Sequence, residues 1–295
     1  MKHRHYILPI LIVFALCLFS CRQSGTVNSS AVYEYTDDYG NTVNVPKSPQ
    51  RVVSLSPAVT EIMYALDNSA ILIGRTDFCQ YPPEAQSIES VGGISNLNVE
   101  KILSLKPDLV ISGSMIPQKS AQQLTKLGVP VVCVIEKPQF EGLYDNIKKI
   151  GSLVCRESVA DSLVAELKKE MSAIPESKGD KPSVYYVVGY GPNGNFTAGG
   201  NTFINDIIRV AGGHNIAEGV QGWSYSLEAL MDNNPDFIII RREDSAGFCK
   251  TKPYTNLDAV KNGKVIAIES SIIDLQIPRN IECIRLLSKA FCNRN

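Results

Sequence analysis

Histidine is scarce in this chain, and that limits the catalytic and metal chemistry open to it. The 295 residues include three histidines, of which His3 and His5 lie in an N-terminal segment that we expect to be removed. A zinc site usually needs several histidines or cysteines, and a Ser-His-Asp hydrolase would depend on His214 alone. His214 lies in the glycine-rich sequence AGGHNIAEG, which predicts a solvated or locally hydrogen-bonded turn residue. We therefore expect no multi-histidine zinc or manganese site.

Carboxylates leave one enzymatic alternative open. Two carboxylates can act as the acid and the base of a glycosidase, so Glu61 with Asp77 could serve an exported hydrolase. The sequence shows neither a nucleophile elbow nor a metal-binding cluster to support such an enzyme. We also expect no phosphate-binding loop in the glycine-rich stretch 189–219. A binding function therefore fits these residues better than an enzymatic one, and we predict that the protein is not an enzyme.

The N-terminal residues predict export and a lipid anchor. A basic start (Lys2, Arg4) precedes an apolar run that ends Leu-Phe-Ser-Cys at Cys21. This ending resembles the lipobox of bacterial lipoproteins, which implies a signal peptide over residues 1–20, acylation of Cys21 and a polar tether over 21–31. The alternative is an ordinary secretory signal with an incidental cysteine. We expect an exported, membrane-anchored protein, periplasmic if the organism is Gram-negative.

Charge and cysteine content narrow the partners further. Without residues 1–20 the chain carries 27 basic and 30 acidic side chains, which gives no basic surface for nucleic acid. Six cysteines remain beyond Cys21, with wide spacings and no C-x-x-C, so they are either disulfide-bonded or buried free thiols. If both lie on the last helix, Cys283 and Cys292 are about 13 Å apart along it and do not pair. The others are Cys79, Cys133, Cys155 and Cys249.

A repeated pattern organises the rest of the chain. The sequence NVEKILSLKPDLVIS (98–112) has a counterpart in SLEALMDNNPDFIII (226–240). In each copy a small polar residue is followed two places later by Glu100 or Glu228, and seven residues after that by Pro-Asp. The pattern predicts an N-cap, a helix of about two turns, a turn and a buried strand. A helix that leads into an apolar strand is one step of a parallel sheet with both faces covered.

Two such steps predict an α/β fold with two similar parallel-sheet lobes. We expect an N-terminal lobe over 32–139, a connector over 140–176 and a C-terminal lobe over 177–295. Helical periodicity in the connector predicts one long helix from Glu157 to Ile174, about 25 Å in length. A helix cannot hinge without losing backbone hydrogen bonds, so only a small closing motion should accompany ligand binding. After the second repeat, up to the strand Val265–Ile268, we expect polar loops.

Several motifs resemble a known family, the helical-backbone substrate-binding proteins of ABC importers for cobalamin, haem and ferric siderophores. RVVSLSPAVTEIMYAL, DFCQYPPEAQ and LNVEKILSLKPDLVI occur here in the order of the cobalamin-binding branch. The resemblance implies a small-molecule ligand between the lobes and a partner made of a permease dimer with its ATPase subunits. It also implies that Glu100 and Glu228 pair with arginines of the permease. The alternative is that both glutamates only favour the positive end of a helix dipole.

The same resemblance implies a corrinoid, vitamin B12-like ligand held by aromatic side chains. The positions that match or neighbour the family's aromatic contacts are Phe78, Tyr81, Phe196 and Trp223, and Trp223 is the only tryptophan of the chain. Ile94 stands where the cobalamin branch often has tryptophan, so haem or a ferric siderophore remains the alternative ligand. For haem, the candidate iron ligands would be Tyr81, Tyr190 or His214, each of which could instead be a packing or turn residue. We expect no resident cofactor or metal.

Overall fold

The computed structural model describes residues 31–175 and 180–292. The predicted signal peptide, the predicted acylation site Cys21 and the predicted tether up to residue 30 lie outside the described residues. Within the described part no helix is long and apolar enough to cross a membrane.

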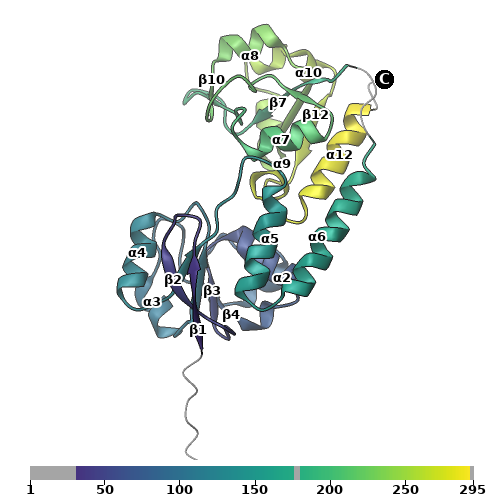
Figure 1. The fold of residues 1–295 in the computed structure, drawn as a ribbon. Coiled ribbons are helices and arrows are strands. Elements are labelled where there is room, and N and C mark those ends of the chain that lie inside the picture. The colour runs from purple at the N-terminus through teal and green to yellow at the C-terminus, as the bar shows by residue number, and fades with distance from the viewer. Residues whose placement is uncertain (1–30, 176–179, 293–295) are drawn as a thin grey trace, which may run out of the picture. The chain divides into compact units, whose positions relative to one another are not determined.

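Two four-stranded parallel sheets form the centres of two lobes (Figure 1). The N-terminal sheet has the order β4-β3-β5-β6 and the C-terminal sheet the order β12-β11-β7-β9. In both sheets every strand pair is parallel. The predicted fold class is confirmed. The strands are β3 (Val52–Ser54), β4 (Leu72–Arg75), β5 (Leu109–Ser112), β6 (Val131–Cys133), β7 (Ser183–Val187), β9 (His214–Asn215), β11 (Phe237–Arg241) and β12 (Val265–Ile268).

The two sheets correspond strand by strand. In each lobe the first strand, β3 or β7, pairs with the strand of the sequence repeat, β5 or β11. These two strands form the centre of the sheet, and each has one further neighbour, which is an edge strand. Numbered along the chain within each lobe, the orders are second, first, third, fourth in the N-terminal sheet and fourth, third, first, second in the C-terminal sheet. Read from the opposite edge, the second order is second, first, third, fourth, so the two lobes share one topology.

The repeated pattern forms the predicted helix and strand in both lobes. In the N-terminal lobe α3 (Val99–Ser104) precedes β5, and in the C-terminal lobe α8 (Leu227–Asn233) precedes β11. The Asn98 side chain accepts a hydrogen bond from the backbone N–H of Lys101 at 2.9 Å, and the Ser226 side chain accepts one from Ala229 at 3.0 Å. Such caps satisfy backbone donors that a helix start leaves unpaired, which explains why the helices begin there.

The remaining elements cover these sheets. The N-terminal lobe begins with an antiparallel hairpin, and short helices flank both sheets. In the C-terminal lobe two short antiparallel strands, β8 and β10, stand apart from the main sheet. The bounds are β1 (Val32–Thr36), β2 (Thr42–Pro46), α2 (Pro57–Ala65), η2 (Ser69–Ile71), η3 (Pro83–Ser87), α4 (Gln118–Lys126), α7 (Phe203–Val210), β8 (Asn195–Phe196), β10 (Ser224–Tyr225), α9 (Arg242–Phe248), η4 (Tyr254–Asn256), α10 (Asp258–Lys261) and α11 (Ser271–Asp274).

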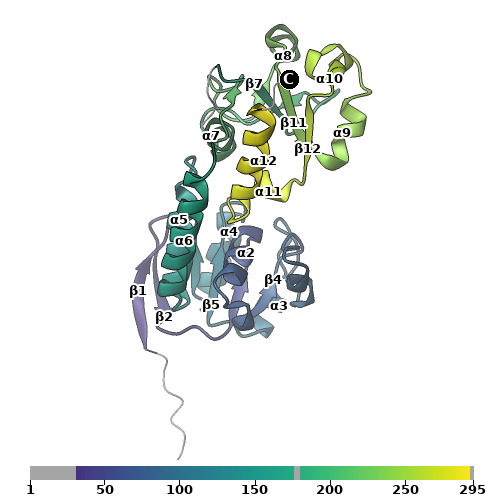
Figure 2. The ribbon, with the colours of Figure 1, turned by 90° about the vertical axis from the view of Figure 1, so that its right-hand side faces the viewer.

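Three helices join the lobes. The helix α5 (Gly142–Leu153) ends at a reversal where Cys155 has a φ of 57°, and α6 (Glu157–Ser172) then runs back alongside it toward the second sheet (Figures 1 and 2). The C-terminal helix α12 (Asn280–Cys292) lies beside α6, with Arg285 paired to Glu170 at 2.8 Å. With 16 residues, α6 is about 24 Å long. It ends two residues before the predicted Ile174.

One hydrophobic cluster extends through both lobes by way of these helices. It includes Val52 and Leu109 of the first sheet, Val164 of α6, and Val184 and Ile239 of the second sheet. Protein interiors are close-packed, so moving one lobe against the other would require repacking this shared core. The lobes are therefore joined more firmly than two domains on flexible linkers would be.

Some local expectations were wrong. The segment after β11 was expected to be loops, but it contains α9 and α10, which are too short and too charged to show helical periodicity. His214 begins the short strand β9, where it pairs with Ser183 of β7, so it is not a turn residue, although it is solvent-exposed as predicted. The six cysteines of the described part are all free thiols, and only Cys79, Cys133 and Cys283 are buried. The expectation of burial therefore fails for the other three.

Candidate ligand-binding cleft

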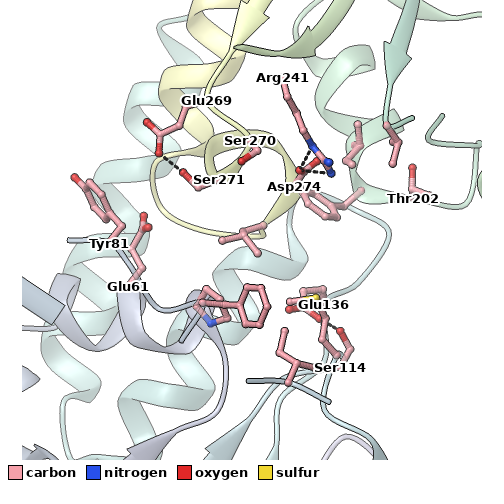
Figure 3. Close-up of a pocket in the computed structure, with 18 of the residues that line it drawn as sticks. Glu61, Tyr81, Ser114, Glu136, Thr202, Arg241, Glu269, Ser270, Ser271 and Asp274 are labelled. Atoms are coloured by element: carbon pink, nitrogen blue, oxygen red, sulfur yellow. Dashed lines mark hydrogen bonds and ion pairs between the residues drawn. The ribbon is translucent and has the colours of Figure 1, made fainter. Parts of the chain in front are cut away.

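A cavity of about 1020 Å³ is lined by residues of both lobes (Figure 3). It lies at the carboxyl ends of the strands, because Ser114 follows β5, Glu136 follows β6, Arg241 ends β11 and Glu269 follows β12. Ligands of open parallel sheets bind at this edge. The volume is at the upper end of the range for small-molecule pockets, which indicates a large ligand.

Aromatic side chains line the cleft from both lobes. Phe78 and Tyr81 lie in the loop between β4 and η3, Phe203 begins α7, and Trp223 precedes β10. Phe78, Tyr81 and Trp223 are exposed by 55%, 41% and 47%, which is unusual for large rings and leaves part of each ring open to a ligand. Three of the four aromatic residues named from the sequence therefore meet in the cleft.

Phe196 is the exception, because it does not line this cavity. In the β8–β10 pair Phe196 lies opposite Ser224, so Trp223, the residue just before Ser224, projects to the other face of the ribbon. Phe196 instead covers Gly189, where an added Cβ would lie 3.2 Å from the ring of Phe196. The two aromatic residues of this ribbon thus have different surroundings.

A charged cluster forms the C-terminal wall of the cleft. Arg241 donates from Nε to Asp274 at 3.0 Å, and its Nη2 lies 2.9 Å from the same carboxylate (Figure 3). The hydroxyl of buried Tyr186 also donates to Asp274. Burial raises the pKa of Tyr186, and the neighbouring Asp274 carboxylate raises it further. The phenol therefore stays protonated, and Arg241 is held with its charge balanced.

A second ion pair connects the two lobes. Arg279, which directly precedes α12, donates to both carboxylate oxygens of Glu61 on α2, from Nε at 3.0 Å and from Nη2 at 2.9 Å. The two side chains are only 12% and 6% exposed. Burial raises the pKa of Glu61, while the hydrogen bonds from Arg279 oppose that rise. Charge-assisted bidentate pairs are strong and geometrically specific, so this contact fixes α2 against the start of α12.

The cleft lining as a whole is more acidic than basic. Among the described residues that line it, the ionisable side chains besides Tyr81 are two cations and four carboxylates: Lys137, Arg241, Glu61, Glu136, Glu269 and Asp274. Both cations are paired, Arg241 with Asp274 and Lys137 with Asp145 at 2.6 Å. Uncharged polar groups complete the wall, among them Gln80, Gln86 and Asn201. The lining can therefore stack on a planar ligand and hydrogen-bond to neutral polar groups around its edge.

The other residues singled out from the sequence lie outside the cleft. Asp77 does not line the cavity and accepts a hydrogen bond from Ser90, so it does not form an acid–base pair with Glu61 across the cleft. Tyr190 packs against Phe248 and Tyr254, and His214 is solvent-exposed beside Glu218. Neither lines the cavity. In the part of the chain that the structure describes, no group of three or more His, Cys, Asp or Glu side chains could hold a metal ion.

Glu100 and Glu228 are both solvent-exposed, each in the first turn of its helix. Neither lines the cavity. Their positions fit both readings of the sequence, since a first-turn carboxylate favours the helix dipole and is also accessible to a partner.

One glycine motif matches a nucleotide-binding pattern in letters only. Residues 189–194 read G-Y-G-P-N-G after β7, but they lead into β8 and not into a helix. The pyrophosphate of a dinucleotide binds at the helix N-terminus that should follow such a motif. This loop lacks that feature.

Sequence reasoning missed Phe203, Arg241, Asp274 and Arg279. Glu61 and Arg279 are 218 residues apart, and no spacing rule joins them. One signal was available, since Glu61 lies within the mostly apolar helix sequence PAVTEIMYA, and a buried carboxylate needs a partner.

The chain matches the sequence profile of a family described as periplasmic binding protein over residues 52–272. It is 32% identical to an uncharacterized ABC transporter substrate-binding lipoprotein, YvrC of Bacillus subtilis, over 98% of both chains. It is 30% identical to a cobalamin-binding protein of Halobacterium salinarum, over 87% of this chain and 73% of the relative.

Solved structures agree in fold. A possible iron-binding periplasmic solute-binding protein of Staphylococcus epidermidis has a TM-score of 0.72 at 29% identity, covering 83% of this chain and 99% of that one. The periplasmic heme-binding protein RhuT of Roseiflexus, in apo form, has a TM-score of 0.77 at 24% identity, covering 83% and 98%. The proteins similar to this chain thus carry names that refer to cobalamin, iron and heme.

Proposed function

This chain belongs to the periplasmic binding protein family, and we propose that it captures a corrinoid, vitamin B12-like ligand between its lobes and delivers it to an ABC permease. The family consists of non-enzymatic binding proteins of ABC transporters for cobalamin, haem and iron siderophores. The protein is therefore an exported substrate-binding protein with a small-molecule ligand and a permease partner, and not an enzyme. The choice of ligand, the docking residues and the lipid anchor at Cys21 are our proposals.

The observation that carries the corrinoid assignment is the combination of aromatic faces with a net acidic lining. Phe78, Tyr81 and Trp223 offer ring faces from both lobes to a large planar molecule. A corrin carries neutral amide groups around its edge, which suit side chains such as Gln80 and Asn201. Cobalamin also carries its own axial ligands, a benzimidazole base on one face of the cobalt and a cyano or similar group on the other, so no ligand from the protein is needed.

The alternative ligands fit less well. Haem carries two propionates and many ferric siderophores are anionic, so both would favour unpaired cations in the cleft. Both cations that line it are paired with carboxylates, and carboxylates outnumber them. Haem iron also needs an axial ligand, and among the described lining residues only Tyr81 and Met115 are of suitable type. The 29% identity to a possible iron-binding protein keeps a ferric chelate as the second candidate.

The experiment is a comparison of bound chromophores. The purified protein is incubated separately with cyanocobalamin, haemin and a ferric siderophore, desalted, and scanned in the visible range. We expect the corrin absorption to remain with the protein in about equimolar amount, and the other two to be lost. Retention of haemin or of the siderophore together with loss of cyanocobalamin would overturn the corrinoid assignment and leave the binding-protein function intact.

Delivery depends on a second surface. We propose that Glu100 and Glu228 are the two charges that pair with the permease dimer, one from each lobe. Their support is the shared topology of the lobes, which gives the two glutamates equivalent positions, and their exposure to solvent. Cyanocobalamin uptake driven by a reconstituted permease separates this role from ligand binding.

A further inference from the structure

We propose that Arg279 is a positioning residue of the ligand site, which holds the ring of Tyr81 in the cleft wall and fixes the two lobes around it. Arg279 does not itself line the cavity, so any effect on the ligand passes through its neighbours. The proposal rests on the proposed function in one respect, because it takes Tyr81 as a ligand contact.

The guanidinium of Arg279 makes contacts both on its planar face and along its edges. Its central carbon lies 3.5 Å from the centroid of the Tyr81 ring, the geometry of a cation–π stack. Nε and Nη2 donate to the two oxygens of Glu61, and Nη2 also lies 3.3 Å from the hydroxyl of Ser271. Nη1 lies 3.9 Å from Glu269.

These partners come from both lobes. Glu61 on α2 and Tyr81 in the loop after β4 belong to the N-terminal lobe. Glu269, which directly follows β12, and Ser271, the first residue of α11, belong to the C-terminal lobe and form a lip of the cleft. Tyr81, Glu61, Ser271 and Glu269 all line the cavity, and Figure 3 shows them on the same side of it. One largely covered cation behind the wall therefore contacts four groups of the wall.

The arrangement gives Tyr81 one covered face and one usable face. Arg279 covers one face of the ring, while the side chain remains 41% exposed and lines the cleft. A planar ligand that stacks on the open face would meet a ring already held in place. Holding a contact group in its bound orientation beforehand removes an ordering cost from the binding free energy. Without Arg279 the ring could rotate, and the lip would lose its contact with α2.

The first test is a double-mutant cycle on the full-length protein with cyanocobalamin as the probe. The variants are Arg279→Met, Tyr81→Leu and both together, with the dissociation constant measured by calorimetry. Each single change should weaken binding by about five- to tenfold, the scale of one aromatic contact. The double change should cost clearly less than the two single losses added together, because Arg279 acts in large part through that ring. Losses that add up would overturn the proposal.

Two further variants serve as controls for the cycle. Arg285→Met removes an exposed arginine ion pair from α12, the helix that Arg279 directly precedes, and should leave the affinity at the wild-type level. Arg279→Met leaves Glu61 buried without its partner and could fail to fold. The combination Glu61→Gln with Arg279→Met contains no unpaired buried charge and should show the same weakened binding.

The second test needs no ligand. Amide hydrogen exchange is followed in the free protein at Cys79 and Gln80, whose backbone N–H groups bond to Thr76 and Phe78 at 3.1 and 3.0 Å. In Arg279→Met and in the combined variant these amides, and those of residues 271–274, should exchange about tenfold faster than in wild type and in Arg285→Met. Unchanged exchange would overturn the proposal. If wild type does not bind cyanocobalamin at all, the proposed ligand fails, and this measurement still decides the role of Arg279.

Discussion

Asp108 and Asp236 make equivalent hydrogen bonds in the two lobes. The Asp108 carboxylate accepts from the backbone N–H groups of Gln50 and Arg51 at 2.8 and 3.0 Å, and the Asp236 carboxylate accepts from the N–H and the hydroxyl of Ser183 at 2.7 and 2.9 Å. Counted along the chain, each aspartate directly precedes the third strand of its sheet, and each donor lies at the start of the first strand. The Pro-Asp of the sequence repeat therefore ties two neighbouring strands together in each lobe.

We expect Asp108→Ala and Asp236→Ala to lower the free energy of unfolding by similar amounts, about 1–2 kcal/mol each, because each removes a charge-assisted acceptor from partly exposed backbone donors. Urea denaturation measures the change. Asp161→Ala is the control, since Asp161 is 65% exposed in its pair with Lys148 and should contribute almost nothing. An unchanged unfolding midpoint in both aspartate variants would show that these contacts are not stabilising.

Replacement of Glu100 or Glu228 by alanine should leave ligand affinity near wild type and weaken docking to the permease. Both carboxylates are exposed and neither lines the cleft, so their loss removes only a charge pair with the partner, about 1–3 kcal/mol. The double variant should be worse, and the difference from wild type should shrink at high salt, which screens the wild-type pair as well. Calorimetry gives the affinity, and uptake into reconstituted vesicles gives the docking.

Glu166→Ala provides the comparison for these variants, because Glu166 is an exposed glutamate on α6 with no place in the repeat. Normal uptake by Glu100→Ala and Glu228→Ala would leave the two glutamates as first-turn residues that only favour the helix dipole. Loss of ligand affinity would mean that these helix starts face the ligand.

Ligand binding should change the radius of gyration very little. The lobes share one hydrophobic cluster, α6 joins them, and the buried pair of Glu61 and Arg279 crosses between them. Gln276 adds a further tie, since its side-chain amide donates to the carbonyls of Lys137 and Gln139, both at 3.1 Å. Small-angle scattering with and without cyanocobalamin tests this. A clear compaction on binding would contradict a rigid connection.

Alkaline pH should destabilise the fold in part through Cys283. Burial raises the pKa of this thiol to about 12, and the nearby Asp274 carboxylate contributes. A group whose pKa is higher in the folded state stabilises the fold fully below its unfolded pKa, near 9 here, and loses that effect as the pH rises toward 12. Cys283→Ala should be less stable at pH 8, because it leaves a cavity, but should lose less stability between pH 9 and 11.

Much of the fold could be predicted from the sequence because its signals are local. The caps at Asn98 and Ser226, the apolar strands after Pro-Asp and the periodicity of the connector each depend on residues close in the chain. The cleft could be predicted only in part. Phe78, Tyr81 and Trp223 were named from family resemblance, and the structure brings them into one cavity.

The parts that could not be predicted are contacts between distant segments. Phe196 is in β8 and Trp223 directly precedes β10. Only the pairing of these two strands shows that the two side chains project to opposite faces. The pairing of Arg241 with Asp274 and of Arg279 with Glu61 depends on how distant segments meet, which local patterns do not encode. The excess of carboxylates over cations in the cleft lining could therefore be recognised only in the structure.

The most direct test of the central claim is a titration of Trp223 emission with cyanocobalamin. Trp223 is the only tryptophan of the chain and lines the cleft, so emission reports on that site alone. We expect saturable quenching that reaches its end point at one ligand per chain, and no such signal from Trp223→Phe, which should still bind the ligand by calorimetry. Unchanged emission together with no heat of binding would contradict the claim that this cleft captures a corrinoid.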